Sequence, residues 1–443
     1  MKNYEIDDVK KLGREENVRY LKLQFTDMLG TIKSVEVPFS RFDDVVANRI
    51  VFDGSSIEGF VRIKETDMHL HPDLSTFLIL PLETSDYGKV ARIICDVHLP
   101  DGSPFIGDPR NNLKRVLNEI KNLGFGDLNI GLEPEFYLFK PNDKGDIAPL
   151  YSDQGSYFDL APLDGCQLLR RDIVLELEKI GFAVETSHHE VGPGQNEINF
   201  HFSSALAACD NVQTFKQIVK QTARKHGLFA SFMPKPVTGI PGNGMHFNCS
   251  LTDNAGRNLF FDSEAPKGLS PLALKWISGI IYYARELTLI TNPIVNSYKR
   301  LISGYEAPGY ICWSDSNRSA MIRIPTARGA QTRTEIRNVD CAANPYLVAA
   351  AVLAAGIEGI VSDIELIPPV DDNIYAMSDE VRCVNGIKNL PENLKEAICE
   401  FSRSALMKKT LGEHIFQKYM IAKKAEWEQY RILVHPWELE HYL

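Results

Sequence analysis

Residues 187–202 read SHHEVGPGQNEINFHF, and this stretch decides the fold class. It predicts two short strands joined by a turn at the GPGQ segment. Along the second strand apolar and polar residues alternate, which gives it an apolar face (Ile198, Phe200, Phe202) and a polar face (Glu197, Asn199, His201). A strand with a patterned polar face of this kind favours a sheet that carries chemistry on one side.

Carboxylates gather on the polar faces of this hairpin and of a second predicted strand. With the turn centred on GPGQ, Glu190 is expected roughly opposite Glu197. Like charges that face each other across two strands are destabilising unless a cation lies between them. In GLEPEFYLF, residues 131–139, Glu133 and Glu135 are two apart and point to the same side. A divalent metal ion would explain both patterns.

Two further segments add candidate ligands to this set. GMHFNCSL (244–251) places His246 on one face with Asn248 and Ser250, and RTEIRN (333–338) places Glu335 between two arginines. Taken singly, such a histidine or acid is more often a satisfied core residue or a solvated one. Taken together, they predict two metal sites, formed by Glu133, Glu135, Glu190, Glu197, His246 and Glu335. Oxygen ligands with one imidazole favour Mg2+ or Mn2+ over zinc.

A concentration of arginines indicates what these metals hold. They are Arg300, Arg318, Arg323, Arg333 and Arg337. The planar guanidinium binds carboxylate or phosphate with two hydrogen bonds, and metal plus arginine is the usual way to neutralise a phosphoryl group in transfer. No GxxxxGK[ST] run and no GxGxxG after a strand is present. A nucleotide is therefore expected to bind without a glycine-rich phosphate loop.

The regions on either side of these motifs predict two domains of an α+β fold. Residues 18–37 have the pattern of a hairpin with its turn at 27–30, and short strands follow at 76–82 and 90–99. A segment rich in Gly, Pro and Asp (101–113) then precedes a long alternation of helices and strands. We expect an N-terminal domain at 1–105 and a catalytic domain at 106–443, with an antiparallel sheet backed by helices. Residues 411–443 are expected to be helical and to pack or contact another subunit.

Composition excludes several classes of function. The chain has 443 residues, a formal net charge of -10 and a pI near 5.6, which argue against nucleic-acid or acidic-membrane binding. No apolar run approaches the length of a membrane span, and the charged N-terminus is unlike a signal peptide, so a cytoplasmic protein is expected. The eight cysteines show no CxxC spacing and are expected to be reduced and structural.

Several motifs in a fixed order resemble type I glutamine synthetase over nearly the whole chain. They are FDGSSIEGF, GLEPEFYLF, EVGPGQNEINF, GNGMHFN, NSYKRL, GYEAP, NRSA with IRIP, and RTEIRN. The resemblance implies an N-terminal β-grasp domain and a homododecamer with active sites between neighbouring subunits. It also implies ATP-dependent ligation of ammonia to L-glutamate through a γ-glutamyl phosphate.

The resemblance assigns roles to individual residues. Glu135, Glu190 and Glu197 would bind the first metal, and Glu133, His246 and Glu335 the second. Substrate glutamate and the transferred phosphoryl group would be held by Arg300, Arg318, Arg337 and the backbone of Gly242. Asp53 of a neighbouring subunit would help to deprotonate ammonium, and Glu306 would close a flap over the intermediate. Nucleotide contacts would come from Glu185, Ser250, Arg323 and Arg333.

Details of the motifs point to one branch of that family and leave alternatives open. The segment VNGIKNLPENL lacks the tyrosine that one branch of the family adenylylates, so the chain resembles the shorter branch, which glutamine itself inhibits. In that branch the position of Arg62 is associated with feedback inhibition. Some members of the branch also bind a nitrogen-responsive transcription regulator when they are inhibited. Pro241 and Asn243 depart from the pattern expected before His246. A ligase for polyamines or other amines, or a non-catalytic regulatory relative, remain the alternatives.

Overall fold

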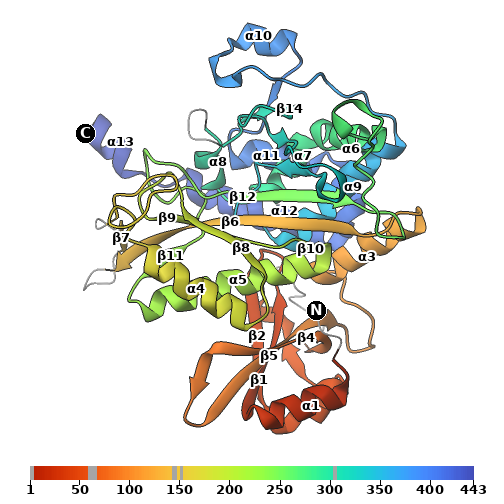
Figure 1. The fold of residues 1–443 in the computed structure, drawn as a ribbon, viewed down its shortest axis with the longest axis vertical. Coiled ribbons are helices and arrows are strands. Elements are labelled where there is room, and N and C mark those ends of the chain that lie inside the picture. Colours follow the sequence, from red (N-terminus) through yellow and green to blue (C-terminus); the bar gives the residue numbers. More distant parts are fainter. Residues whose placement is uncertain (1–3, 58–66, 142–146, 150–152, 303–306) are drawn as a thin grey trace.

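A computed structural model describes residues 4–57, 67–141, 147–149, 153–302 and 307–443 (Figure 1). Arg62 and Glu306, to which the resemblance assigns roles, lie outside these ranges. Within them, no helix is both long and apolar enough to cross a membrane. All eight cysteines are free, and only Cys383 and Cys399 are exposed.

The N-terminal part is a five-stranded sheet in the order β2-β1-β5-β4-β3. Its strands are β1 (Val18–Thr26), β2 (Ile32–Pro38), β3 (Val51–Asp53), β4 (Asp67–Ser85) and β5 (Gly88–His98). β1 and β5 are parallel and the other neighbours are antiparallel. The predicted β1–β2 turn is confirmed: the Asp27 carboxylate accepts the backbone N–H groups of Leu29 and Thr31 at 3.0 and 2.9 Å.

One face of this sheet is covered by α1 (Ile6–Glu15), and α2 (Phe42–Val46) lies beside β4. Val9 of α1 and Leu21, Leu23 and Ile93 of the sheet are fully buried in one apolar cluster. Alternating apolar residues on β1 and β5 form this small core because successive strand side chains point to opposite faces.

The larger part is built on a second sheet with the path β14-β15-β16-β12-β6-β9-β8, to which β7, β10 and β11 add by pairing with β6. Its neighbours are antiparallel, except that β14 and β15 are parallel. The strands are β6 (Leu128–Pro141), β7 (Ile147–Pro149), β8 (Val184–His189), β9 (Gln195–Phe200), β10 (Ser203–Ser204), β11 (Phe229–Ser231), β12 (Met245–Leu251), β14 (Trp313–Ser314), β15 (Ile322–Arg323) and β16 (Thr334–Ile336). β13 (Tyr310–Ile311) and β17 (Lys388–Asn389) form a separate pair.

Helices cover this sheet, as the sequence predicted. α4 packs on β8 and β9, α5 packs on β6, and the apolar α9 packs against α3, α5 and α6 (Figure 1). The helices are α3 (Pro109–Asn122), α4 (Gln167–Lys179), α5 (Ala205–Lys225), α6 (Pro271–Tyr282), α7 (Ala284–Thr291), α8 (Ser297–Arg300), α9 (Pro345–Val361), α10 (Asp379–Val384), α11 (Leu394–Ser402), α12 (Ala405–Arg431) and α13 (Pro436–Tyr442).

Close packing of α6 on α9 depends on two glycines. A Cβ on Gly279 would lie 2.1 Å from the Ala355 carbonyl oxygen, and one on Gly359 would lie 2.2 Å from that of Lys275. Only glycine permits so near an approach of two helix backbones. The two helices belong to the apolar core of the larger part, in which Trp276 of α6 is fully buried.

A cluster of charges joins the N-terminal sheet to helices α3 and α5 of the larger part. Arg110, at the start of α3, donates to Asp96 of β5 and Asp73 of β4, each at 2.7 Å, and to Asp210 of α5 at 2.8 Å. The Tyr346 hydroxyl donates to Asp210 at 2.7 Å. The boundary predicted at residues 105 and 106 lies in the loop between β5 and α3, and it stays a prediction.

Two details of the sequence analysis were wrong. Glu190 lies opposite Gln195 rather than Glu197, because the turn spans residues 191–194 and His188 pairs with Glu197. β9 ends at Phe200, so Phe202 lies beyond the strand with 46% of its surface exposed. Glu190 and Glu197 still share a face, because they are diagonal neighbours across the hairpin.

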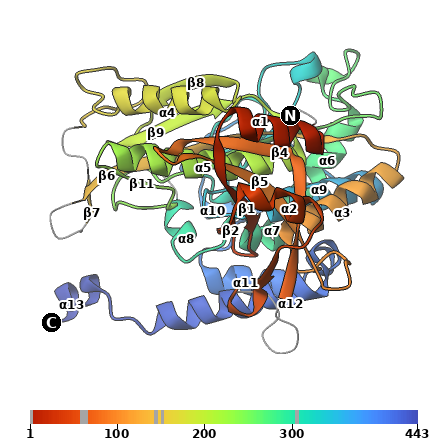
Figure 2. The same ribbon diagram turned by 90° about the horizontal axis from the view of Figure 1, so that it is seen from below.

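The C-terminal segment leaves the body of the molecule. The long α12 is interrupted at Gly412, whose φ is 74°, and after Arg431 the chain continues to α13, which projects outward in both views (Figures 1 and 2). Trp437 is 56% exposed and Tyr442 is 74% exposed. The helical character predicted for residues 411–443 is confirmed for α12 and α13.

Candidate active site

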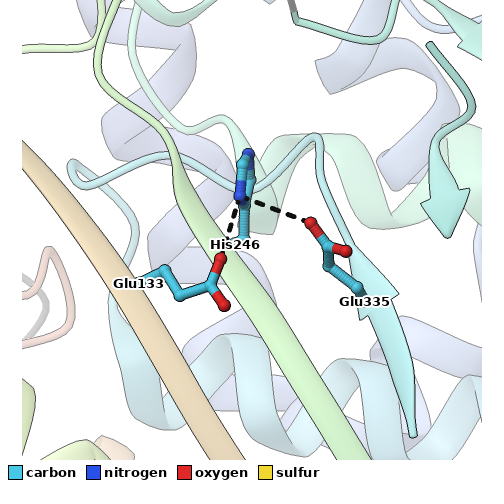
Figure 3. Close-up of side chains that lie close together, drawn as sticks. All are labelled: Glu133, His246 and Glu335. Atoms are coloured by element: carbon cyan, nitrogen blue, oxygen red, sulfur yellow. Dashed lines mark hydrogen bonds and ion pairs between the residues drawn. The ribbon is translucent and has the colours of Figure 1, made fainter. Parts of the chain in front are cut away.

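The predicted metal ligands line one cavity of about 620 Å³ above the large sheet. Glu133, His246 and Glu335 come from the adjacent strands β6, β12 and β16. Pairing sets His246 opposite Glu133, and Asn248 opposite Glu335. The His246 Nδ1 lies 3.2 Å from a Glu133 oxygen and 3.5 Å from a Glu335 oxygen (Figure 3). All three offer a ligand atom within 4.8 Å of the others.

The second group lies on β6, β8 and β9 beside the first. Pairing sets Glu135 opposite Glu197. His188 stands between two of the acids: its Nδ1 is 3.6 Å from Glu190 Oε1, and its Nε2 is 3.5 Å from Glu197 Oε1. His188, Glu190 and Glu197 also satisfy the 4.8 Å condition. Sequence reasoning did not single out His188, although the HH pair ensures that one imidazole faces the acids.

These carboxylates are crowded and withdrawn from water. Glu135, Glu190, Glu197 and Glu335 are each no more than 8% exposed. Burial raises the pKa of the Glu135 carboxyl, and the charge of Glu197 raises it further against the opposing effect of His246. Burial acts on Glu133 in the same direction, but hydrogen bonds from His246 and Asn248 outweigh it and lower that pKa. Divalent cations fit this donor set of carboxylate oxygens and one imidazole.

A third acidic cluster, Asp153, Asp164 and Cys166, has the same spacing but different chemistry. Asp153 accepts a hydrogen bond from His189 Nε2 at 2.7 Å, and Asp164 is paired with Arg170. Burial raises the pKa of the Cys166 thiol to about 12, so it stays protonated. The charges of this cluster are balanced inside the protein, which makes it a structural element rather than a metal site.

Four of the five predicted arginines line the cavity that holds the acids: Arg300, Arg318, Arg323 and Arg337. Arg323 donates to Glu335 Oε2 at 2.9 Å, and Arg337 donates to the other oxygen of Glu335. Arg300 is 3% exposed and its guanidinium donates to the carbonyls of Asn338 and Arg337 at 2.8 and 3.0 Å. These bonds fix the plane of the Arg300 guanidinium at the cavity wall.

The loop before β12 closes one side of the cavity with Pro241 and Gly242. A Cβ on Gly242 would lie 2.2 Å from the Pro234 carbonyl oxygen, so only glycine fits there. Asn243 is fully buried, and its amide donates to the carbonyls of Ser231 and Met233 at 3.2 and 2.9 Å. Asn243, which departs from the expected motif, therefore holds the loop to the segment at Ser231 and Met233.

Comparison with known proteins identifies the family. A model of the glutamine synthetase β-grasp domain matches residues 17–100, and a model of the glutamine synthetase catalytic domain matches residues 106–442. The chain belongs to the glutamine synthetase family. The resemblance noted from its motifs is thereby confirmed, as is the combination of a β-grasp domain with a helix-backed catalytic sheet.

Relatives within the family are similar along their whole length. The glutamine synthetases of Staphylococcus aureus and Staphylococcus epidermidis are each 54% identical over 437 residues, which cover 99% of this chain and 98% of the relative. A solved GmaS/ADP complex is 33% identical with a TM-score of 0.89, covering 98% of this chain and 99% of that one. The glutamine synthetase of Plasmodium falciparum, 24% identical with a TM-score of 0.88 over 100% of this chain and 99% of that one, shares the fold.

Glutamine synthetases use ATP, and a second cavity of about 390 Å³ is open to it beside the first. Glu185, Ser250 and Arg333 line this second cavity, whereas Arg323 lines the cavity with the acids. Glu133 lines both, so the two cavities share a wall. The exposed Phe202, which the strand pattern had placed on the apolar face, also lines the second cavity and offers an aromatic ring there.

Asp53 lies apart from the residues that line these two cavities. It lies at the end of β3, exposed, where its carboxylate accepts the backbone N–H of Ser55 at 2.8 Å. Hydrogen bonds from the Ser55 side chain and from its backbone N–H lower the pKa of Asp53. Among the described residues that line the acid cavity, none comes from the N-terminal sheet. Asp53 does not meet the metal ligands of its own chain.

Sequence reasoning also missed other residues that line the acid cavity, among them Tyr157, Gln195 and Tyr375. Tyr157 stacks edge-on to His188 at a centroid distance of 5.6 Å. Gln195 stood inside the quoted GPGQ motif but was assigned only to the turn. Tyr157 lies in a turn and Tyr375 in a short 3-10 helix (Ile374–Ala376), where no strand alternation indicates which way a side chain points.

Proposed function

We propose that this member of the glutamine synthetase family joins ammonia to the side-chain carboxylate of L-glutamate at the expense of ATP, giving L-glutamine, ADP and phosphate. One observation carries the proposal. A cavity lined by five crowded glutamates and four arginines shares the wall residue Glu133 with a second cavity of nucleotide size. Negative ligands for cations and positive ligands for phosphate are thus set side by side.

Two divalent cations, Mg2+ or Mn2+, would be held in the acid cavity. Glu135, Glu190 and Glu197 would hold one, and Glu133, His246 and Glu335 would hold the other. Bound there, the cations would neutralise and orient phosphate and carboxylate oxygens. Asn248 supports the second set, since it donates to Glu133 at 2.9 Å and accepts from Arg333 at 3.0 Å.

In the first chemical step the arginines would bind the substrate glutamate and the phosphoryl group that is transferred. Arg300, Arg318 and Arg337 would hold the substrate glutamate and the phosphoryl group, with the Gly242 backbone beside them. The γ-carboxylate oxygen attacks the terminal phosphorus of ATP in line, and the bond from that phosphorus to the bridging oxygen breaks, releasing ADP. The product is γ-glutamyl phosphate, whose phosphate is a far better leaving group than a carboxylate oxygen.

The second step consumes ammonium. Asp53 of a neighbouring subunit would accept a proton from ammonium, and the resulting ammonia attacks the acyl carbon as phosphate departs. Glu306 would close over the intermediate and keep water from hydrolysing it. Glu185, Ser250, Arg323 and Arg333 would contact the nucleotide.

Assembly into a homododecamer accords with the position of Asp53 away from its own chain's cavity. The proposal includes a cytoplasmic protein with domains at 1–105 and 106–443. It also includes feedback inhibition by glutamine through Arg62, and a nitrogen-responsive transcription regulator as a partner of the inhibited enzyme. Equal inhibition of wild type and Arg62→Ala by added glutamine would reject the role of Arg62.

The decisive assay is phosphate release from ATP, with glutamate and ammonium each omitted in turn. The proposal requires full turnover only when all three are present, and putrescine in place of ammonium should support little or none. Shared sites are tested by mixing inactive Asp53→Ala and Glu197→Ala variants after dissociation and reassembly. Activity should return in the mixture if a site takes Asp53 from one subunit and Glu197 from another.

A further inference from the structure

Gln195 is almost fully buried between the acid cluster and the loop that closes the cavity, with 1% of its surface exposed. Its Nε2 donates to Glu135 Oε2 at 3.0 Å and to the Gly242 carbonyl oxygen at 3.0 Å. Its Oε1 accepts from the Gly192 N–H at 3.0 Å and lies 3.3 Å from the Tyr137 hydroxyl, whose single proton has a nearer acceptor in the Pro241 carbonyl at 2.8 Å. Both N–H donors of this amide are therefore in use, and its oxygen accepts a backbone N–H.

The orientation of the amide follows from its neighbours. Glu135 Oε2 and the Gly242 oxygen only accept hydrogen bonds, whereas the Gly192 N–H only donates. A flipped amide would set its oxygen against a carboxylate and a carbonyl and leave the Gly192 N–H facing an NH2 group. The network thus fixes the NH2 group toward Glu135 and Gly242.

Glu135 is tied to the same loop a second time. Its Oε2 also accepts the backbone N–H of Gly244 at 2.8 Å. Gly242 and Gly244 flank the buried Asn243, so one carboxylate oxygen and one amide hold both sides of this short loop. Any shift of the loop must displace the Glu135 carboxylate or break these bonds.

We propose that Gln195 is a positioning residue that couples cation binding at Glu135 to glutamate binding at the loop containing Gly242. This role of Gln195 rests on the proposed function, because it takes Glu135 as a metal ligand and Gly242 as part of the glutamate site. Binding of either ligand fixes one end of the amide bridge. The second ligand then binds to a carboxylate or a loop that the amide already holds in place. Its binding therefore costs less conformational entropy than it would in the free protein.

The test measures the dissociation constant of Mn2+ with and without saturating glutamate, and that of glutamate with and without saturating Mn2+. Linkage requires the two ratios to be equal, and typical coupling factors lie between about 5 and 150. Gln195→Met keeps the length of the side chain but removes both donors. We expect its coupling factor to fall at least about five-fold from the wild-type value, with a raised KM for glutamate and a smaller change in kcat.

Two further variants separate coupling from general loosening. Gln195→Glu replaces the NH2 group by a carboxylate oxygen, and it takes the place of Gln195→Met if that variant does not fold. Tyr137→Phe is the matched control, because it removes the hydroxyl that donates to the Pro241 carbonyl of the same loop at 2.8 Å and leaves both bonds of the Gln195 NH2 group, to Glu135 and Gly242, in place. We expect Tyr137→Phe to keep the wild-type coupling factor.

The proposal is overturned if the Gln195 variants retain wild-type coupling, or if Tyr137→Phe loses as much of it as they do. Wild-type protein that binds Mn2+ and glutamate independently would also overturn it, while leaving the proposed function standing. Wild-type protein that binds neither ligand would instead refute the proposed function. The two failures are therefore distinguishable in one set of titrations.

Discussion

Two clusters of buried acids lie against opposite faces of β8, and they are built on opposite principles. His188 turns toward Glu190 and Glu197, whereas the next residue, His189, turns away and pairs with Asp153. The Asp153 and Asp164 cluster holds its own counter-charges in His189 and Arg170. In the glutamate cluster a single imidazole, that of His188, stands between Glu190 and Glu197, and a third carboxylate, that of Glu135, lies opposite Glu197. Spacing alone does not mark a metal site; an unbalanced buried charge does.

The largest effect should follow from removing one of the unbalanced acids. We expect Glu197→Gln to lower kcat/KM about 1000-fold, because a lost cation costs several kcal/mol of transition-state stabilisation. In the presence of a chelator the same variant should melt at a higher temperature than wild type, since Glu197 and Glu135 repel each other. Steady-state kinetics and thermal unfolding check the two halves. Activity within ten-fold of wild type would contradict the assignment.

The balanced cluster should respond in the opposite sense. Asp164→Asn leaves the buried guanidinium of Arg170 without its anion, which should cost about 3–5 kcal/mol of stability. Thermal unfolding with and without chelator measures the loss, which should be the same in both. Glu428→Gln removes the acid of an exposed pair with Arg431 and is the matched control. If Asp164→Asn were neutral, the distinction between the two clusters would fail.

Adding cations gives the next effect in size. Mn2+ or Mg2+ at about 100 times its dissociation constant should stabilise the folded protein by about 2.7 kcal/mol per site, and a chelator should reverse the gain. Glu197→Gln should lose part of this gain, while any Asp164→Asn protein that folds should keep it. A thermal-shift titration is sufficient. An equal response of the two variants would show that the glutamates are not the ligands.

The neighbouring cavity should be sensitive to a different change. Phe202→Ala should raise the KM for ATP about ten-fold, since stacking of a base on an aromatic ring is worth about 1–3 kcal/mol. Stabilisation by Mn2+ should remain at its wild-type value. Phe229 is exposed to the same degree, 45% against 46%, but does not line that cavity, so Phe229→Ala should leave the KM unchanged.

The smallest effect concerns a third group of charges, around Arg110. Burial raises the pKa of Asp73, but hydrogen bonds from Ser75 and Arg110 outweigh it and hold that pKa below its usual value. A lowered folded-state pKa gives stability that is present above about pH 4 and lost as pH falls further. Asp73→Asn should therefore cost about 1 kcal/mol at pH 7, and this cost should shrink progressively as pH falls below about 4. Denaturant unfolding at several pH values checks this convergence.

Strand alternation predicted the polar faces of the large sheet and, from their combined ligands, two metal sites. The period of two placed Glu133 with Glu135 on one face and His246 opposite Phe247, because the alternation is set by the backbone alone. The register of β8 against β9 could not be obtained in this way. It depends on how many residues the turn uses, and GPGQ allowed a centre one residue from the observed one.

The supporting residues were harder to find because their roles depend on contacts between distant segments. Gln195 acts through Gly242, and Asp153 acts through His189, and no local pattern links either pair. Asn243 looked like a flaw in a substrate loop and proved to be its buried anchor. The strand patterns predicted two metal sites, and the family resemblance supplied which ligands belong to each.

The projecting α13 gives the protein a built-in optical probe. Trp276 is fully buried and Trp313 is 6% exposed, whereas Trp437 is 56% exposed on this helix. Iodide or acrylamide should therefore quench the emission of Trp437 strongly and that of the buried indoles hardly at all. Anything that covers the helix, including another copy of the chain, would be visible in a fluorimeter as loss of the quenchable fraction, without any label.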